Sequence, residues 1–204
     1  KRASLLFSDF DRLHDLLVNP WRPVQIVFAG KAHPEDQPGK EVLQQVYTFT
    51  RDPRLEGRVA FIEDYEMHLA HRLVQGSDLW LNVPRVPLEA CGTSGMKAAL
   101  NGVPSFSVLD GWWIEGHVEG VTGWSIGGPN GGDNENDSES EVQSLYEKLE
   151  HIILPLFYRD TDKFTEVMRS AIAINGSFFN TQRMVFQYLR NAYALGSSSG
   201  APLP

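Results

Sequence analysis

Residues 79–102, LWLNVPRVPLEACGTSGMKAALNG, contain a complete strand–loop–helix unit. The short apolar run 79–83 predicts a buried strand, and the helical spacing of 93–101, which stops before Gly102, predicts a helix. A long stretch with several prolines and glycines, 84–97, leads from the strand into this helix. A unit of this kind favours a parallel sheet, because parallel strands must be joined by a crossover that is usually helical.

The same alternation continues on both sides of this unit. Short runs rich in β-branched and aromatic residues predict further strands at 24–28, 58–62, 105–109 and, more weakly, 123–126. Helical spacing predicts helices at 4–18, 39–51, 65–76, 142–157 with a bend at Pro155, 162–174 and 180–194. We therefore predict an α/β fold with a Rossmann-like parallel sheet and flanking helices over residues 1–195. The acidic stretch 127–140 is predicted to be a flexible loop, and 196–204 a disordered tail.

The composition excludes several classes of protein. The chain has 204 residues, 42% of them hydrophobic, and a net charge of −8, so broad binding to nucleic acid or an anionic membrane is not expected. No apolar run reaches the ~18 residues of a membrane helix. The single cysteine, Cys91, cannot form an internal disulfide, which suits a reducing cytoplasm. Because Lys1 and Arg2 run straight into helical spacing, we expect a fragment of a longer protein.

The turn Gly92-Thr93-Ser94-Gly95 carries the strongest chemical signal. It opens the helix 93–101, where free backbone N–H groups and the positive end of the helix dipole would favour a phosphate. An ordinary capped helix start is the alternative. Lys97 lies about one turn further along, and burial there would favour the neutral amine needed for a Schiff base. A phosphate site beside such a lysine indicates pyridoxal phosphate, whereas the alternative is a solvated surface lysine.

Two further features of the neighbourhood are open to more than one interpretation. Glu89 could accept hydrogen bonds from sugar hydroxyls, or it could pair with Arg85. Trp112 and Trp113 could stack on a sugar, although adjacent aromatic residues more often divide between core and surface. His68 and His71 share a helix face but have no evident third ligand, so we predict no metal site.

At this stretch the chain resembles the α-glucan phosphorylase family, and its details are closer to the shorter bacterial and archaeal members. The resemblance depends on five segments: Ala29-Gly30-Lys31-Ala32, Glu63-Asp64-Tyr65 with Leu69-Ala70, Glu89 to Lys97, Leu100-Asn101-Gly102 and Leu109-Asp110-Gly111. It implies the C-terminal half of a two-domain GT-B fold, with the N-terminal half absent. It also implies transfer of a terminal glucosyl unit from an α-1,4-glucan to inorganic phosphate, giving glucose 1-phosphate, with pyridoxal phosphate as cofactor.

The resemblance also assigns roles to individual residues. Lys97 falls at the Schiff-base lysine, and Thr93 and Ser94 fall where the helix start holds the cofactor phosphate. Glu89 and the backbone of Cys91 and Gly92 fall where the family holds the glucosyl hydroxyls, and Tyr65 falls near the cofactor. Lys1 and Arg2 resemble the end of a Y-K-R segment whose lysine binds the substrate phosphate. Two positions depart from the pattern, since Cys91 replaces a serine and Glu66 stands where mammalian-type members have an arginine.

Two other functions remain open from the sequence. A retaining transferase that uses a nucleotide sugar would share the fold, but it commonly has a second glutamate eight residues after the first. In this chain that position is Lys97, which cannot accept the ribose hydrogen bonds. A non-catalytic module that binds pyridoxal phosphate or glucan is the second alternative. We expect the isolated chain to be inactive, because an active site between two domains is incomplete on one.

Overall fold

The computed structural model describes residues 1–55, 57–128 and 135–193, and within them the strands form two parallel sheets. β1 (Ile26–Ala29) pairs with β2 (Val59–Ile62), while β4 (Ser105–Val108) lies between β3 (Trp80–Asn82) and β5 (Gly123–Ile126). The predicted α/β class and the parallel direction are confirmed. The strands are nevertheless hydrogen-bonded as two separate sheets, where the sequence predicts one.

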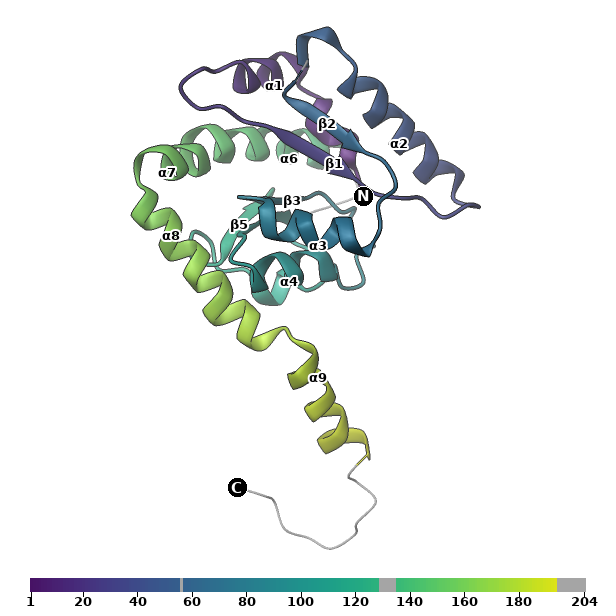
Figure 1. Cartoon of the computed structure of the whole chain (residues 1–204), viewed down its shortest axis with the longest axis vertical. Coiled ribbons are helices and arrows are strands. Elements are labelled where there is room, and N and C mark those ends of the chain that lie inside the picture. The colour runs from purple at the N-terminus through teal and green to yellow at the C-terminus, as the bar shows by residue number, and fades with distance from the viewer. Residues whose placement is uncertain (56, 129–134, 194–204) are drawn as a thin grey trace, which may run out of the picture.

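Helices cover and join these sheets (Figure 1). The α-helices are α1 (Phe10–Leu17), α2 (Gln37–Thr50), α3 (Met67–Gly76), α4 (Thr93–Leu100), α5 (Trp113–Gly116), α6 (Glu135–Lys148), α7 (Leu154–Arg159), α8 (Thr161–Ser170) and α9 (Thr181–Tyr188). Short 3-10 turns occur at η1 (Ala3–Phe7) and η2 (Pro53–Leu55), and π-helical turns at η3 (Leu149–Ile153), η4 (Ala171–Gly176) and η5 (Leu189–Tyr193). In Figure 1, α9 extends away from the rest of the molecule.

Several predicted boundaries are wrong, each for a local reason. The helix predicted at 4–18 is divided into η1 and α1, because the Asp9 side chain accepts a hydrogen bond from the Arg12 N–H and caps a new helix there. Residues 135–140 are the start of α6 rather than loop, since acidic residues are favoured in the first turns of a helix. Residues 127–128 of the predicted loop lie outside any helix or strand, whereas 129–134 and the predicted tail lie outside the described residues.

One hydrophobic core is shared by the two sheets. Apolar side chains of β1, β2, β4 and β5 meet those of η1, α1 and α6 in a single cluster. Leu13 and Leu17 of α1 and Leu145 of α6 are completely buried there, and burial of such a side chain stabilises the fold by roughly 1.5–3 kcal/mol. The buried Tyr146 hydroxyl donates to the Leu6 carbonyl, and burial raises the pKa of Tyr146. The cluster thus holds two separately hydrogen-bonded sheets in one molecule.

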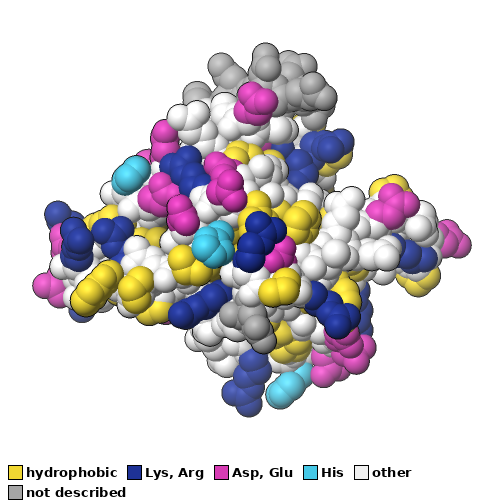
Figure 2. Space-filling model, turned by 90° about the horizontal axis from the view of Figure 1, so that it is seen from above, with side chains coloured by type: hydrophobic (Ala, Val, Ile, Leu, Met, Phe, Trp, Pro, Cys, Tyr) yellow, Lys and Arg dark blue, Asp and Glu magenta, His cyan; other side chains and the backbone are white. Residues whose placement is uncertain are grey.

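A second, smaller cluster lies under α4. Trp112 and Trp113 pack there with Ala99 and Ala171, and their exposed fractions are 5% and 1%. Both alternatives for these two rings are therefore wrong, because neither ring is exposed for a sugar to stack on and the pair does not divide between core and surface. Figure 2 shows a different part of the surface, where acidic and basic side chains are interspersed with exposed apolar ones.

A polar network fastens α6 to β5. Glu119 accepts hydrogen bonds from Lys148 of α6 (2.6 Å), from the N–H and hydroxyl of Ser125 in β5 (both 2.9 Å), and interacts with His117 Nε2 (2.7 Å). Partial burial raises the pKa of Glu119, but these hydrogen bonds outweigh it and lower the pKa to about 2 from an ordinary value of 4.5. The ionised carboxylate therefore stabilises the folded state.

Replacing Glu119→Gln should remove a pH-dependent part of the stability. Because the folded-state pKa of Glu119 is depressed, its contribution is complete above about pH 4.5 and is lost as the pH falls towards about 2. The difference in free energy of unfolding between the original chain and the variant, measured by urea titration, should shrink across that window. Glu115→Gln, at an exposed position of α5, is the matched control and should show no such change. A difference for Glu119→Gln that is constant from pH 6 to pH 2 would contradict the assignment.

Candidate functional site

The N-terminus of α4 is built around a glycine that no other residue can replace without strain. Gly92 is the N-cap and has φ 84°, a left-handed conformation that side chains disfavour. A Cβ atom there would lie 2.6 Å from Glu89 Oε1. No side chain of the described residues caps this helix, so the first N–H groups of α4 face outward from the carboxyl ends of β3 and β4. The helix start thus has the N–H groups without a side-chain cap that the sequence predicts, and not the ordinary capped start that was the alternative.

The loop before α4 is bound to the turn after β4 by a buried carboxylate. Asp110, 5% exposed, accepts hydrogen bonds from the N–H groups of Glu89 and Gly111, both at 2.9 Å. The Trp112 N–H donates to the Cys91 carbonyl at 2.8 Å, and a Cβ on Gly111 would lie 2.5 Å from that same oxygen. Residues 89–92 therefore have little freedom to move relative to β4.

The buried ring of Trp112 packs against the first turn of α4. A Cβ on Gly95 would lie 2.8 Å from Trp112 Nε1, and one on Gly116 would lie 2.7 Å from another atom of the same ring. The indole edge-packs against Phe179, which follows η4. Gly95, which the sequence predicts to be part of a phosphate site, therefore also has a packing role, because only a glycine leaves room for the Trp112 ring.

The side chain of Glu89 contacts that of Lys1. Lys1 Nζ donates to Glu89 Oε1 at 2.5 Å and to Asn82 Oδ1, at the end of β3, at 2.6 Å. The Glu89 side chain is 13% exposed and that of Lys1 49% exposed. The alternative pairing of Glu89 with Arg85 is not the one that the structure shows. A lysine, a carboxylate and an amide therefore meet at the carboxyl end of β3.

Arg2 has a different environment from Lys1. Its guanidinium donates to Glu141 of α6 at 2.5 Å and to the Pro84 carbonyl at 2.7 Å. Glu141 is 2% exposed, and a buried carboxylate is costly unless it is paired in this way. The structure thus separates two residues that the sequence analysis treats together.

The proposed cofactor residues lie on and beside α4. Ser94 Oγ accepts from the Trp80 Nε1 at 3.3 Å, whereas the side chains of Thr93 and Lys97 are exposed. The burial of Lys97 expected from its apolar neighbours is absent, because Ala98 and Ala99 point into the protein and Lys97 points out. Cys91 is also exposed. Tyr65 is half-buried just before α3, a helix that packs beside α4. Among the described residues no hydrogen bond joins Tyr65 to α4.

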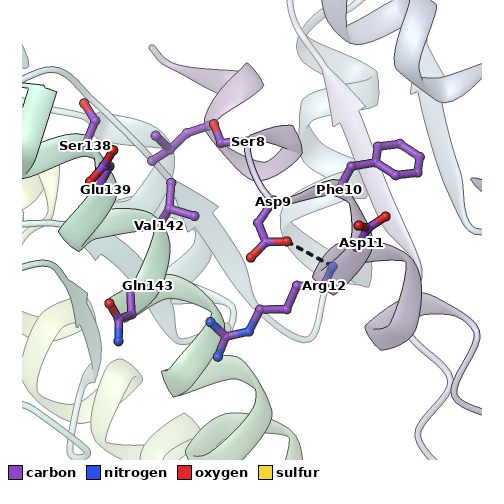
Figure 3. A pocket seen from close by; sticks show the side chains of 10 residues that line it. Ser8, Asp9, Phe10, Asp11, Arg12, Ser138, Glu139, Val142 and Gln143 are labelled. Atoms are coloured by element: carbon purple, nitrogen blue, oxygen red, sulfur yellow. Dashed lines mark hydrogen bonds between the residues drawn. The ribbon is translucent and has the colours of Figure 1, made fainter.

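Cys91, Thr93 and Lys97 are exposed, whereas Glu89, Ser94 and Tyr65 are partly buried beside them. A hollow of about 560 Å³ lies elsewhere, between the start of α1 and α6, with Asp9, Arg12 and Gln143 around it (Figure 3). None of the candidate residues lines that hollow. In the described ranges no group of three His, Cys, Asp or Glu side chains could hold a metal ion, and no helix is long and apolar enough to cross a membrane.

Sequence reasoning missed two residues of this site. Asn82 and Asp110 were not assigned roles, although each stands at the end of a predicted strand, where loops of parallel sheets form binding sites. That position is the signal that could have identified them. Asp110 also belongs to one of the segments by which the family resemblance was detected.

Comparisons with a family model and with curated proteins both find carbohydrate phosphorylases. A model of the carbohydrate phosphorylase family matches residues 5–193. Glycogen phosphorylase of Aquifex aeolicus is 44% identical over 199 residues, covering 95% of this chain and 28% of that protein. Maltodextrin phosphorylase of Thermococcus litoralis is 44% identical over 195 residues, covering 95% of this chain and 23% of that protein. The chain thus spans about a quarter of the length of these curated relatives.

A likeness among solved structures concerns the fold. HepE of Anabaena, crystallised with UDP and glucose, superposes with a TM-score of 0.66 at 23% sequence identity. The match covers 94% of this chain and 44% of HepE. HepE has the GT-B fold, so the predicted Rossmann-like fold of GT-B type is confirmed for this chain.

The Asp110→Asn substitution should loosen the loop before α4. An asparagine presents one oxygen and one NH₂ group where the structure needs two acceptors, so one of the Glu89 and Gly111 N–H groups loses its partner. We expect the amide of Glu89 or of Gly111, whichever faces the NH₂ group, to exchange with solvent roughly tenfold faster or more, as measured by hydrogen exchange. Asp78→Asn, at an exposed position before β3, is the matched control. Unchanged exchange at both Glu89 and Gly111 would show that Asp110 does not hold the loop.

Proposed function

Because the chain belongs to the carbohydrate phosphorylase family, we propose that residues 1–195 form the cofactor-binding domain of an α-1,4-glucan phosphorylase. The enzyme would transfer a terminal glucosyl unit to inorganic phosphate and release glucose 1-phosphate. The observation that carries this proposal is the uncapped N-terminus of α4, with Lys97 one turn along it and Glu89 beside it.

The residues present fit pyridoxal phosphate. Thr93 and Ser94 offer backbone N–H groups and hydroxyls at the positive end of α4, where a phosphate is favoured. Gly92 has no side chain to block the approach of an anion to the backbone, and a Cβ there would lie 2.6 Å from Glu89 Oε1. The exposed amine of Lys97 would bind the cofactor covalently. When bound, pyridoxal phosphate supplies a second phosphate group that can exchange protons beside the substrate phosphate.

Glu89 is proposed to hold the sugar. Its carboxylate oxygens can accept hydrogen bonds from two glucosyl hydroxyls, and the backbone N–H groups of Cys91 and Gly92 lie in the same rigid loop. The hydrogen bonds to Asp110 and Trp112 keep this loop from moving when the sugar binds, which lowers the entropic cost of orienting the reacting bond. Glu89 therefore acts as a binding group whose position is set by β4.

Lys1 is proposed to bind the substrate phosphate. Its ammonium lies within hydrogen-bond distance of Glu89, so an anion held by Lys1 would lie next to a sugar held by Glu89. A positive group there would also stabilise the phosphate as the glycosidic bond breaks. Arg2 is assigned a positioning role instead, because its guanidinium fastens the loop at Pro84 to Glu141 of α6.

The partners follow from the same proposal. An α-1,4-glucan and inorganic phosphate are the substrates, and a second domain of the longer protein would cover the exposed side chains of Thr93, Cys91 and Lys97. A nucleotide-sugar transferase is disfavoured because Lys97 stands where that class has a carboxylate. A non-catalytic module is the remaining alternative, and it is distinguished by activity.

Lys97 should be the residue that takes up pyridoxal phosphate. After incubation of the chain with the cofactor and reduction with borohydride, peptide mapping should find the label on Lys97 at close to one equivalent. Lys97→Arg should abolish this label, whereas Lys40→Arg on the exposed face of α2 should leave it unchanged. Because inorganic phosphate would compete at the N-terminus of α4, it should reduce the labelling. Equal labelling of several lysines would contradict a built cofactor site.

Phosphorolysis should depend on Glu89 in the longer protein that carries this chain. Glu89→Gln keeps the shape but removes the charge, and we expect kcat/KM for release of glucose 1-phosphate from glucan to fall by roughly 100-fold or more. Glu115→Gln is the control and should keep full activity. The 204-residue chain alone should release no glucose 1-phosphate, and an active isolated chain would refute the two-domain site.

A further inference from the structure

The ammonium of Lys1 is held by two acceptors of different charge. Lys1 Nζ donates to the amide oxygen of Asn82 at 2.6 Å and to the carboxylate of Glu89 at 2.5 Å. An ammonium has three N–H groups, and within the described residues only these two acceptors bind one. Because the Lys1 side chain is 49% exposed, the third N–H is available to a molecule that arrives from solvent. Lys1 is thus fixed on one side and open on the other.

Asn82 makes a second hydrogen bond, which runs into the sheet. Asn82 in β3 lies opposite Ser107 in β4, so the two side chains are neighbours on one face. Asn82 Nδ2 donates to Ser107 Oγ at 3.2 Å, and Ser107 Oγ donates to the Val108 carbonyl at 2.8 Å. A hydroxyl has one hydrogen, so Ser107 accepts from Asn82 while it donates to Val108. The NH₂ group of Asn82 therefore faces Ser107, and its oxygen faces Lys1.

A flipped Asn82 amide would lose both of its hydrogen bonds. Its NH₂ group would then meet the ammonium of Lys1, and two donors cannot bond to each other. Its oxygen would meet Ser107 Oγ, whose hydrogen is already used on the Val108 carbonyl. Ser107 is 2% exposed, so water is not at hand to replace the lost partner. The surroundings therefore favour one orientation of the amide.

The acceptor that Asn82 supplies carries no charge, and this affects how Lys1 attracts an anion. Glu89 already balances the positive charge of Lys1. A second carboxylate in place of the Asn82 amide would give the group a net negative charge, which repels a phosphate. An apolar side chain there would leave the ammonium with one acceptor and more freedom to move. An amide fixes the ammonium without weakening its attraction for an anion.

We propose that Asn82 is a positioning residue for Lys1. Held in one orientation by Ser107, Asn82 fixes the ammonium through an uncharged acceptor and leaves its third N–H for the substrate phosphate. The identity of that anion rests on the proposed function, whereas the positioning rests on the hydrogen bonds of this chain. Asn82 acts through Lys1 and does not touch the reacting atoms.

The first test observes the ammonium directly, in the 204-residue chain with ¹⁵N-labelled lysine. Nuclear magnetic resonance measures how fast the ε-ammonium protons exchange with water, and Lys1→Arg identifies the Lys1 signal. Asn82→Leu removes the acceptor at nearly the same size. Exchange at Lys1 should then become roughly tenfold faster or more, which is the effect of one lost hydrogen bond to a charged group. Asn82→Asp keeps an acceptor, so exchange should stay slow.

Ser107→Ala tests the bond that orients the amide. It leaves the Asn82 NH₂ group without its acceptor, so exchange at Lys1 should become severalfold faster. Ser105→Ala is the matched control and should leave this exchange unchanged. Ser105 lies on the same face of β4, is 3% exposed, and its hydroxyl has no hydrogen-bond partner among the described residues. Slow exchange of the Phe106 backbone amide reports that β4 is intact in each variant.

The second test uses phosphorolysis by the longer protein that carries this chain. With Asn82→Asp, KM for inorganic phosphate should rise roughly tenfold or more because of the added negative charge. KM for glucan should change by less than about threefold, because the sugar is held by other groups. A purely structural role of Asn82 would change the two KM values alike.

The two tests separate this inference from the proposed function. Unchanged exchange at Lys1 in Asn82→Leu would overturn the inference, as would equal effects of Ser107→Ala and Ser105→Ala. Exchange at Lys1 as fast as at the exposed Lys31 in the original chain, or equal rises of both KM values, would also overturn it. A longer protein without phosphorolysis would refute the proposed function instead, and the exchange measurement would still decide whether Asn82 positions Lys1.

Discussion

The hydrogen bonds accepted by the buried Asp110 carboxylate hold together the parts of the candidate site. They join the turn after β4 to the loop before α4, two segments about twenty residues apart in the sequence. With this loop fixed, Gly92 takes its left-handed conformation, α4 begins without a side-chain cap and the Glu89 carboxylate faces the end of β3. A buried carboxylate tolerates little displacement of its partners, because a lost hydrogen bond leaves a charge unpaired in the interior.

The sheets that carry this site are held together by side chains rather than by a continuous ladder. The segment η1 and the helix α6 supply apolar side chains that fill the space between the sheets. Two polar contacts orient α6 on this core: the pair of Arg2 with Glu141, and the network of Glu119 with Lys148 and Ser125. The hydrophobic contacts give most of the stabilisation, whereas these charge-assisted bonds define the direction of α6.

The exposure of the candidate site is the exposure that the proposed two-domain enzyme would require. Thr93, Cys91 and Lys97 lie on the surface, while the groups that position them, Asp110 and Trp112, are buried. The chain spans about a quarter of the length of these curated relatives, and in the proposed enzyme its exposed side chains would lie on one wall of the site. Buried groups that fix the loop and exposed side chains that remain accessible are the arrangement expected for a binding surface that a second domain would complete.

The sequence by itself determined the α/β class, the approximate positions of all five described strands and the start of α4, because these depend on local periodicity and on a glycine-rich turn. It also carried the family resemblance, in five segments of which Glu89 to Lys97 is the longest. Only the tertiary structure decided that Lys1 meets Glu89, that Arg2 pairs with Glu141, and that Trp112 and Trp113 are buried. Each of these depends on contacts between residues that are brought together only by the fold, and local patterns do not specify such contacts. The division into two sheets is of the same kind, since hydrogen bonding between strands is set by their neighbours in space.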